Sequence, residues 1–261
     1  MEAIVVIPAR FSSSRFPGKP LAKVAGQSLI SRVWHLARAV PGVSSVYVAT
    51  DSEDIAAHVV AFGGDVVMTS GSCRNGSERV WEAVQGLKDP PAIIVNLQGD
   101  AALMPPWIIG ALINEMKNDL SVQIATPAVR LTKAQYNSML EMKSKGIVSG
   151  TTVTFGTNYN ALYFSKGIIP FVREWPKSDE SPIFQHIGVY AYTYEGLRRY
   201  VELPQTPLES VEQLEQLRAI EHGMPIRVVE VSLKGRTVWS VDNPEDVVRI
   251  EQIISAEGEL I

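Results

Sequence analysis

The sequence predicts a doubly wound α/β fold with a mostly parallel sheet, and three observations support this prediction. Short runs rich in Val and Ile alternate with amphipathic stretches of helical spacing. The runs are apolar on both faces, which is typical of parallel strands that helices cover from each side. A regular alternation of strands and helices favours a sheet wound in both directions.

The first half of the chain gives the clearest elements. β-branched residues predict four strands, at residues 3–7, 45–50, 65–69 and 92–98. Helices are expected between and after them, at residues 28–40, 52–62 and 105–116. Apolar side chains recur at helical spacing in the first helix. Ser52 is a favourable N-cap for the second, and proline opens the third, where a missing N–H costs nothing.

The second half is less regular. We expect a β-hairpin over residues 151–165 and further strands at 187–193, 226–231 and 237–241. One helix is predicted over residues 207–223, ended by Gly223, and a closing helix over residues 243–256, started by Asn243 and Pro244. Residues 1–261 then form one domain, with an irregular insert at about 130–205 for substrate binding or dimerisation.

Composition limits the function. A formal net charge of −4 argues against a general nucleic-acid binder, which carries a basic face. Cys73 is the single cysteine, which fits a reducing compartment. The first residues lack the basic and apolar regions of a secretory signal. No apolar run approaches the ~20 residues that span a bilayer. We therefore expect a cytoplasmic protein that binds neither nucleic acid nor membranes.

The loop after the first strand gathers cations. The stretch "VVIPARFSSSRFPGK" places Arg10, Arg15 and Lys19 beside three serines, residues 12–14, and beside Gly18. Small residues let backbone N–H groups approach a ligand, and cations with exposed amides make a phosphate site. The alternative is a solvated surface loop. We interpret the loop as a site for a polyanion such as a triphosphate.

Two familiar nucleotide motifs are missing from this loop. A P-loop would need glycine at the position of Ser13, and Ser or Thr at the position of Pro20. The sequence also has no G-x-G-x-x-G, so a dinucleotide-binding dehydrogenase loses its main support.

Several segments together resemble one family. "IPARFSSSRFPGKPL" resembles the signature loop of sugar nucleotidyltransferases, above all of the 3-deoxy-manno-octulosonate (Kdo) cytidylyltransferase family. Further segments match that family in order over nearly the full length: "VATDSEDIA", "NGSERV", "VNLQGD", "ALYFSK", "IGVYAY", "RRYVELPQTPLESVEQLEQLRAIEHG" and "VDNPEDV". The resemblance implies a nucleotide-diphospho-sugar transferase-like fold. It also implies transfer of CMP from CTP to an acid sugar, with release of pyrophosphate, in lipopolysaccharide biosynthesis.

The resemblance also implies a nucleotide site. Ala9, Arg10 and Lys19 should hold the CTP phosphates, with Arg15 nearby. The segments that lie against base, ribose or sugar in the family contribute Arg74, Ser77 and Gln98.

Two aspartates match the metal ligands of the family. Asp100 ends "NLQGD" after the fourth predicted strand, and Asp242 precedes the closing helix. Mg²⁺ prefers one or two carboxylates together with phosphate oxygens, so we expect it as the cofactor. The alternatives are a helix or turn cap at Asp100 and a plain turn at Asp242. With Arg10 and Lys19 these acids are the expected catalytic residues, which requires both acids to meet opposite Lys19.

The sugar site of the family lies under the second half of the chain. The matching segments contribute His186, Tyr190, Glu209 and Gln213, together with Gln98. On a single helix over residues 207–223, Glu209 and Gln213 share one face. The alternatives are a solvated acidic face for that helix and a structural role for His186.

The sequence departs from the family at three places. Ala101 and Ala102 stand where the family has Glu-Pro, and Lys166 stands where it has Arg, a change that replaces a forked cation by a point charge. Residues 152–155 lack a lysine of the family pattern. These changes gather toward the sugar side, so the sugar is either Kdo or its 8-amino analogue.

Two rival functions remain open. One is nucleotidyl transfer to a different sugar or to a polyol phosphate, and the other is an inactive relative that binds nucleotide. The resemblance further implies a homodimer, formed through the region at about 130–205.

Overall fold

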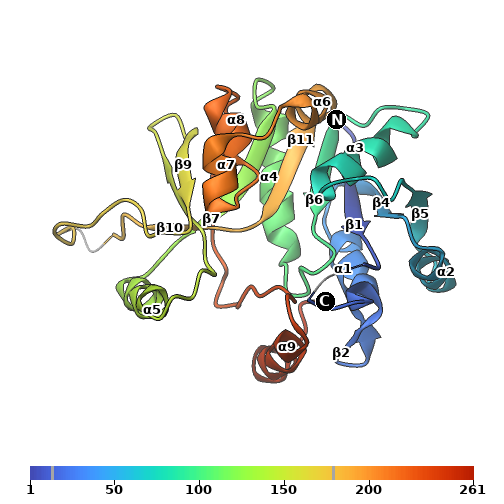
Figure 1. The fold of residues 1–261 in the computed structure, drawn as a ribbon, viewed down its shortest axis with the longest axis horizontal. Helices are drawn as coiled ribbons and strands as arrows, with labels where there is room; N and C mark the ends of the chain where they lie inside the picture. Colours follow the sequence, from blue (N-terminus) through green and yellow to red (C-terminus); the bar gives the residue numbers. More distant parts are fainter. Residues whose placement is uncertain (13–14, 178–179) are drawn as a thin grey trace.

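One mixed sheet organises the chain. The computed structural model describes residues 1–12, 15–177 and 180–261. Within these ranges ten strands follow the order β5-β4-β1-β6-β11-β7-β10-β8-β9, with β12 paired to β7 (Figure 1). Helices cover both faces, so the predicted doubly wound α/β class is confirmed.

The first half forms the parallel part of the sheet. Its strands are β1 (Ala3–Ala9), β4 (Val43–Thr50), β5 (Asp65–Met68) and β6 (Ile93–Leu97), all at predicted positions. Its helices are α1 (Leu29–Arg38), α2 (Glu53–Ala61), α3 (Gly76–Gln85) and α4 (Pro106–Asn118). Between β1 and α1 lie the 3₁₀ helix η1 (Lys19–Leu21) and the small hairpin β2 (Lys23–Val24) and β3 (Gln27–Ser28).

The second half adds mainly antiparallel strands. These are β7 (Ile124–Arg130), β8 (Thr152–Phe155), β9 (Ala161–Ser165), β10 (Phe184–His186) and β11 (Val189–Thr193). Helices α5 (Lys133–Ser144) and α6 (Tyr194–Glu202) accompany them, and β12 (Arg227–Val231) runs parallel to β7. The hairpin predicted over residues 151–165 is confirmed as β8 and β9. Strands of the region at 130–205 thus continue the same sheet.

Two predicted elements are wrong. The helix expected over residues 207–223 is broken into α7 (Pro207–Glu212) and α8 (Leu217–Glu221), because Gln213 adopts the left-handed conformation at φ 54°. Residues 237–241 form no strand. The segment around them instead folds back on the closing helix α9 (Pro244–Glu257), whose Glu257 carboxylate accepts from the Thr237 amide at 2.9 Å.

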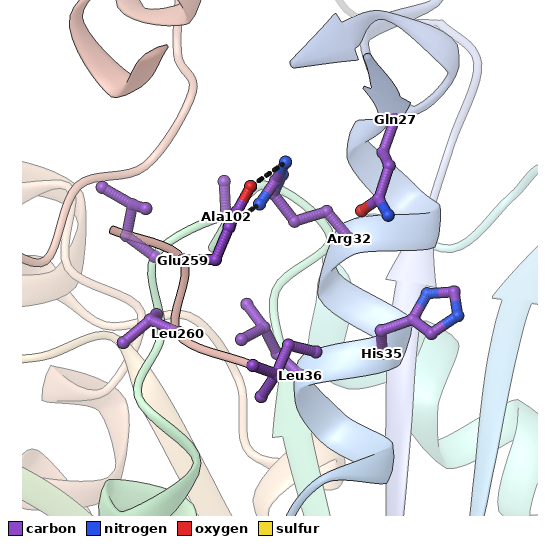
Figure 2. Close-up of a pocket in the computed structure, with 9 residues that line it drawn as sticks. Gln27, Arg32, His35, Leu36, Ala102, Glu259 and Leu260 are labelled. Atoms are coloured by element: carbon purple, nitrogen blue, oxygen red, sulfur yellow. Dashed lines mark hydrogen bonds and ion pairs between the residues drawn. The ribbon is translucent and has the colours of Figure 1, made fainter. Parts of the chain in front are cut away.

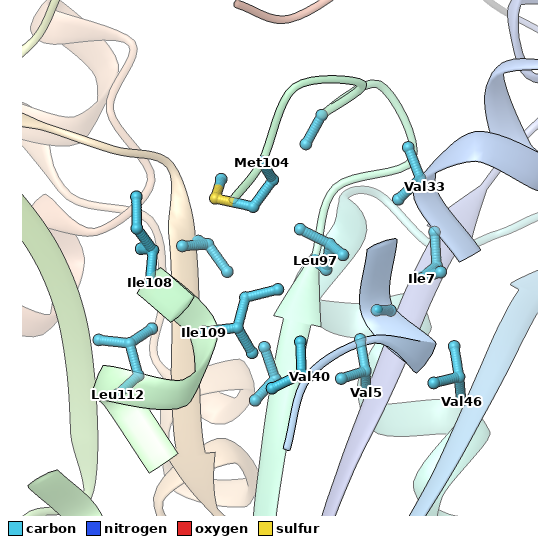
Figure 3. Packing of buried hydrophobic residues seen from close by; sticks show 14 of the residues in the cluster. Val5, Ile7, Val33, Val40, Val46, Leu97, Met104, Ile108, Ile109 and Leu112 are labelled. Atoms are coloured by element: carbon cyan, nitrogen blue, oxygen red, sulfur yellow. The ribbon is translucent and has the colours of Figure 1, made fainter. Parts of the chain in front are cut away.

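The core fills both faces of the sheet. Successive β1 side chains alternate between two apolar clusters, since strand residues point to opposite faces. Val5 and Ile7 face the cluster that contains Ile109 and Leu112 of α4 (Figure 3). Among the described residues, no helix has the length and apolar character needed to cross a bilayer.

The two leucines of the α4 region provide a matched test of this packing. Leu112 is fully buried, whereas Leu120, just after α4, is 71% exposed. We expect Leu112→Ala to lower the free energy of unfolding by about 3 kcal/mol, through lost burial and a cavity. Leu120→Ala should change it by less than about 0.5 kcal/mol. Urea unfolding of both variants measures the difference, and equal losses would contradict the packing described.

Candidate active site

A polar cavity of about 350 Å³ opens at the carboxyl ends of β1 and β6. Ligands of open α/β sheets bind at this edge. Many of the residues singled out by sequence line the cavity: Ala9, Arg10, Arg15, Lys19, Arg74, Gln98, Asp100 and Asp242. The fold therefore brings distant stretches of the chain around one space.

The cationic loop is held in a tight turn before η1. The Gly18 amide donates to the Phe11 carbonyl at 3.0 Å, and Gly18 has φ 70°, a left-handed conformation that glycine adopts without strain. Lys19 follows at once and lines the cavity. Ser13 and Ser14, part of the serine run expected to present amides, lie outside the described residues.

Lys19 bonds Asp100 and the residue that precedes Asp242. Its Nζ donates to Asp100 Oδ2 at 2.6 Å and to the carbonyl of Val241 at 2.8 Å. The Val241 amide donates to the Asp100 carbonyl at 3.1 Å, which fixes the two segments beside each other. Since Asp242 follows directly, these two acids, 142 residues apart in the sequence (242 − 100), line one cavity with the cationic loop.

Arg15 binds the second acid in a more open setting. Its Nη2 lies 2.7 Å from Asp242 Oδ1, and the two side chains are 62% and 51% exposed. Exposed ion pairs contribute little stability because water screens them. Arg15 is thus free to exchange this carboxylate for a phosphate.

A glycine lets the two strand ends approach each other. A Cβ on Gly99 would lie 2.9 Å from the Pro8 carbonyl oxygen, closer than real side chains come. Only glycine therefore fits where β1 and β6 deliver Lys19 and Asp100 to the cavity. This spacing explains why Gly99 precedes the aspartate.

The other wall of the cavity includes residues that sequence reasoning missed. Cys73, Asn75 and Arg79 line it. Arg79 is buried and donates to Thr69 Oγ1 at 2.6 Å and to Asp51 Oδ2 at 3.1 Å. The sequence signal for Arg79 was Asp51, an acid directly after β4 that can pair with an arginine of α3.

The Cys73 thiol does not behave as a nucleophile. Burial and a hydrogen bond to Glu82 raise its pKa to about 11, so the thiol stays protonated near neutral pH.

Ser77, expected in the nucleotide site, does not line the cavity. It is buried and accepts a hydrogen bond from Asn96 Nδ2 at 3.4 Å. Its hydroxyl also contacts Glu215, whose pKa is raised by burial. Glu215 further accepts from the Tyr200 hydroxyl at 3.2 Å. This buried network connects α3 to the segment between α7 and α8.

Of the expected sugar residues, only Gln98 lines this cavity; the other four, His186, Tyr190, Glu209 and Gln213, lie elsewhere. His186 and Tyr190 lie on β10 and β11 with ring centroids 5.5 Å apart. Glu209 is buried and forms a two-point ion pair with Arg218, at 2.5 and 2.9 Å. Gln213 is exposed at the break between α7 and α8. The shared helical face expected for Glu209 and Gln213 does not exist.

Lys166 lies close to these residues. Its backbone N–H donates to Glu212 Oε2 at 2.8 Å. Burial, aided by the charge of Lys166, lowers the pKa of His186 to about 3, so this imidazole is neutral. His186 Nε2 lies 2.8 Å from Thr126 Oγ1, whose hydroxyl in turn donates to the Val189 carbonyl.

The donor set fits a magnesium ion shared with a triphosphate. Asp100 and Asp242 offer carboxylate oxygens, the ligands that Mg²⁺ prefers, and Mg²⁺ takes its other ligands from phosphates and water. Over the described part of the chain, no three His, Cys, Asp or Glu side chains gather as a closed metal site. A site completed by substrate oxygens agrees with both observations.

The chain is similar to known proteins over nearly its whole length. The family model described as Cytidylyltransferase matches residues 4–226. The chain is 52% identical over 262 residues to 3-deoxy-manno-octulosonate cytidylyltransferase of Maricaulis maris, with both chains fully covered. It is 40% identical to 8-amino-3,8-dideoxy-manno-octulosonate cytidylyltransferase of Shewanella sp. (strain W3-18-1), covering 98% of this chain and 100% of that relative.

A solved structure extends the similarity to three dimensions. CMP:2-keto-3-deoxy-manno-octonic acid synthetase, complexed with CTP, superposes with a TM-score of 0.85 at 33% identity. The match covers 98% of this chain and 100% of that chain. 4-diphosphocytidyl-2C-methyl-D-erythritol synthase from Anaerococcus prevotii, at 11% identity and a TM-score of 0.59, shares the fold.

The neutral His186 predicts a pH dependence of stability. Below about pH 6.5 the unfolded histidine takes up a proton, whereas the folded one does so only near pH 3. The free energy of unfolding should therefore fall as pH drops between these values. His186→Gln, which keeps a donor for Thr126, should show a shallower fall in acid unfolding curves. The same change at the exposed His222 is the control, and parallel curves for wild type and His186→Gln would contradict the assignment.

Proposed function

The chain belongs to the cytidylyltransferase family, and we propose that it transfers CMP from CTP to an eight-carbon acid sugar of the Kdo type, releasing pyrophosphate. The single observation that carries the proposal is the meeting of Lys19, Asp100 and Asp242 around one cavity. Nucleotidyl transfer depends mainly on positioning and on neutralising phosphate charge, and these residues supply both.

The cations of the loop hold the triphosphate in this proposal. Arg10 and Arg15 have accessible guanidinium groups at the mouth of the cavity, and each can bind phosphate oxygens through a fork. Lys19 lies deeper, with its side chain 17% exposed, and places a point charge beside the acids. There it stabilises negative charge that develops on the α-phosphate and on the departing pyrophosphate.

Asp100 and Asp242 are the residues that would hold Mg²⁺, which would supply positive charge to the triphosphate and to the attacking hydroxyl. In the structure each acid is paired with a cation of the loop. These pairs orient the carboxylates before substrate arrives. When Arg15 and Lys19 bind the triphosphate, Asp100 and Asp242 would be left to hold Mg²⁺.

The sugar is proposed to lie toward β10 and β11. Lys166 offers a cation for the sugar carboxylate, and the neutral His186 and Tyr190 lie nearby as uncharged polar groups. Gln98 lines the CTP cavity, and its Nε2 donates to Asn96 at 3.0 Å. It thus stands between the nucleotide and this region.

The rival of an inactive relative has less support. Ala101 and Ala102, which replace Glu-Pro of the family pattern, are 5% and 1% exposed and pack in the core. Neither lines the cavity of Asp100, so the replacement leaves the cations and both acids in place.

We also propose a homodimer working in the cytoplasm. Apolar side chains are exposed in the region at about 130–205, with Val148 at 68%, Leu162 at 63% and Phe171 at 89%. Covering such surface is the usual role of an interface. Sedimentation velocity would test the oligomeric state. The proposed compartment rests on the single cysteine, which fits a reducing environment.

Asp100→Asn tests the catalytic proposal. The amide keeps the shape of the side chain but removes the charge that Lys19 and Mg²⁺ require. We expect an unchanged fold by circular dichroism and a loss of pyrophosphate release of at least about 100-fold with CTP, Mg²⁺ and Kdo. Asp89→Asn, in an exposed loop, is the matched control. Wild-type turnover by Asp100→Asn would refute the metal role.

Turnover with two sugars tests the substrate. Pyrophosphate release should occur with Kdo or its 8-amino analogue, and the ratio of kcat/KM values identifies the preferred one. Lys166→Arg restores the forked cation of the family and should change KM for the sugar more than KM for CTP. Binding of CTP without turnover on either sugar would favour an inactive relative or a different acceptor.

A further inference from the structure

The position of Asp242 depends on how residues 232–261 pack against the rest of the fold. Residues 232–261, here called the docked segment, comprise a loop, Asp242 and α9. The segment packs on the core through Val241 and Ile250, both fully buried. Asp242 immediately precedes α9, so the position of its carboxylate follows the position of this helix.

The contacts at the near end of the docked segment are not independent of substrate. Arg15 holds Asp242, and Lys19 holds the Val241 carbonyl. Both cations are proposed to bind the triphosphate, which competes for them. Other hydrogen bonds remain: from the Val241 amide to the Asp100 carbonyl, from the Ala25 amide to Glu251 at 2.9 Å, and from Trp107 Nε1 to the Ser232 carbonyl at 2.9 Å.

The far end is held by a two-point ion pair. Arg32 of α1 donates to Glu259 Oε2 at 2.5 Å and to Oε1 at 3.2 Å (Figure 2). It also donates to the Val24 carbonyl at 3.1 Å, in the hairpin that follows Lys19. The Arg32 side chain is 7% exposed, so its charge has few other partners. Charge-assisted pairs of this geometry are strong and directional.

Packing alone does not fix this end. A cavity of about 300 Å³ lies between α1 and the tail, lined among others by Leu36, Ala102 and Leu260 (Figure 2). Ile253 and Ile254 of α9 pack against the core, but the apolar contacts under residues 259–261 are incomplete, so the ion pair is the contact that attaches these last residues to α1. Within the docked segment, Arg236 holds the residues after α9, since it donates to the Gly258 carbonyl at 2.8 Å.

We propose that Arg32 and Glu259 are positioning residues for the metal site. By holding the far end of α9, a helix of 14 residues and about 21 Å, they keep Asp242 beside Asp100 when the triphosphate takes Arg15 and Lys19. The inference rests on the proposed function, because it needs Asp242 as a metal ligand. Neither residue touches the CTP cavity.

The test measures Mn²⁺ binding to the whole protein in the presence of CTP and without sugar. The readout is the paramagnetic signal of free Mn²⁺. Glu259→Gln should weaken Mn²⁺ binding by about tenfold, at the low end of what changes in groups that orient metal ligands cause. Amides of α9 should exchange with solvent faster in this variant. Glu259→Asp, which keeps the charge, should restore most of the affinity.

The matched control is Glu257→Gln. Glu257 has the same charge near the same helix end, but its carboxylate bonds Thr237 inside the docked segment. It should leave Mn²⁺ affinity within about twofold of wild type. Wild-type affinity in Glu259→Gln, or an equal loss in Glu257→Gln, overturns the inference alone. Wild-type protein that binds no Mn²⁺ with CTP overturns the proposed function and this inference together.

Discussion

The pairing of Lys19 with Asp100 is the constraint on which the site depends. The two side chains are 17% and 26% exposed, so their ionised forms lose hydration on folding. The Val241 carbonyl accepts a second hydrogen bond from Lys19 and offsets part of this cost. The arrangement needs β1 beside β6, a glycine at position 99 and a docked chain end. One half-buried cation, Lys19, therefore requires all three of these distant features to be in place.

Local signals in the sequence were sufficient for the parallel half and for the position of the cationic loop at the edge of the sheet, whereas the two acids came from the family resemblance and Ser77 was misplaced. Parallel strands end at one edge, so residues that follow them, such as Arg10 and Asp100, meet without further information. The helix over residues 207–223 failed for the opposite reason. Its pattern is helical, but Gln213 turns left-handed so that Glu209 can pair with Arg218 in the interior. Only tertiary contacts reveal that exchange, and no window of sequence contains them.

The departures from the family have structural meanings that their positions in the sequence concealed. Ala102 lies two residues past Asp100 yet lines the cavity beside residues 259–261, not the cavity of Asp100. The charge of Lys166 helps to lower the pKa values of His186 and Lys143. Lys166 is far in the sequence from both Asp100 and Asp242. One change therefore concerns packing against α1, and the other concerns the electrostatics around His186. Sequence comparison alone treats the two alike.

The order of the site residues along the chain has a consequence for synthesis on the ribosome. The cationic loop and Asp100 emerge early, but Asp242 follows 142 residues later (242 − 100). At typical elongation rates this interval lasts on the order of ten seconds. During it the nascent chain carries the anion-attracting loop without the second carboxylate. In the proposed mechanism, catalytic competence is thus acquired only after translation has passed β12.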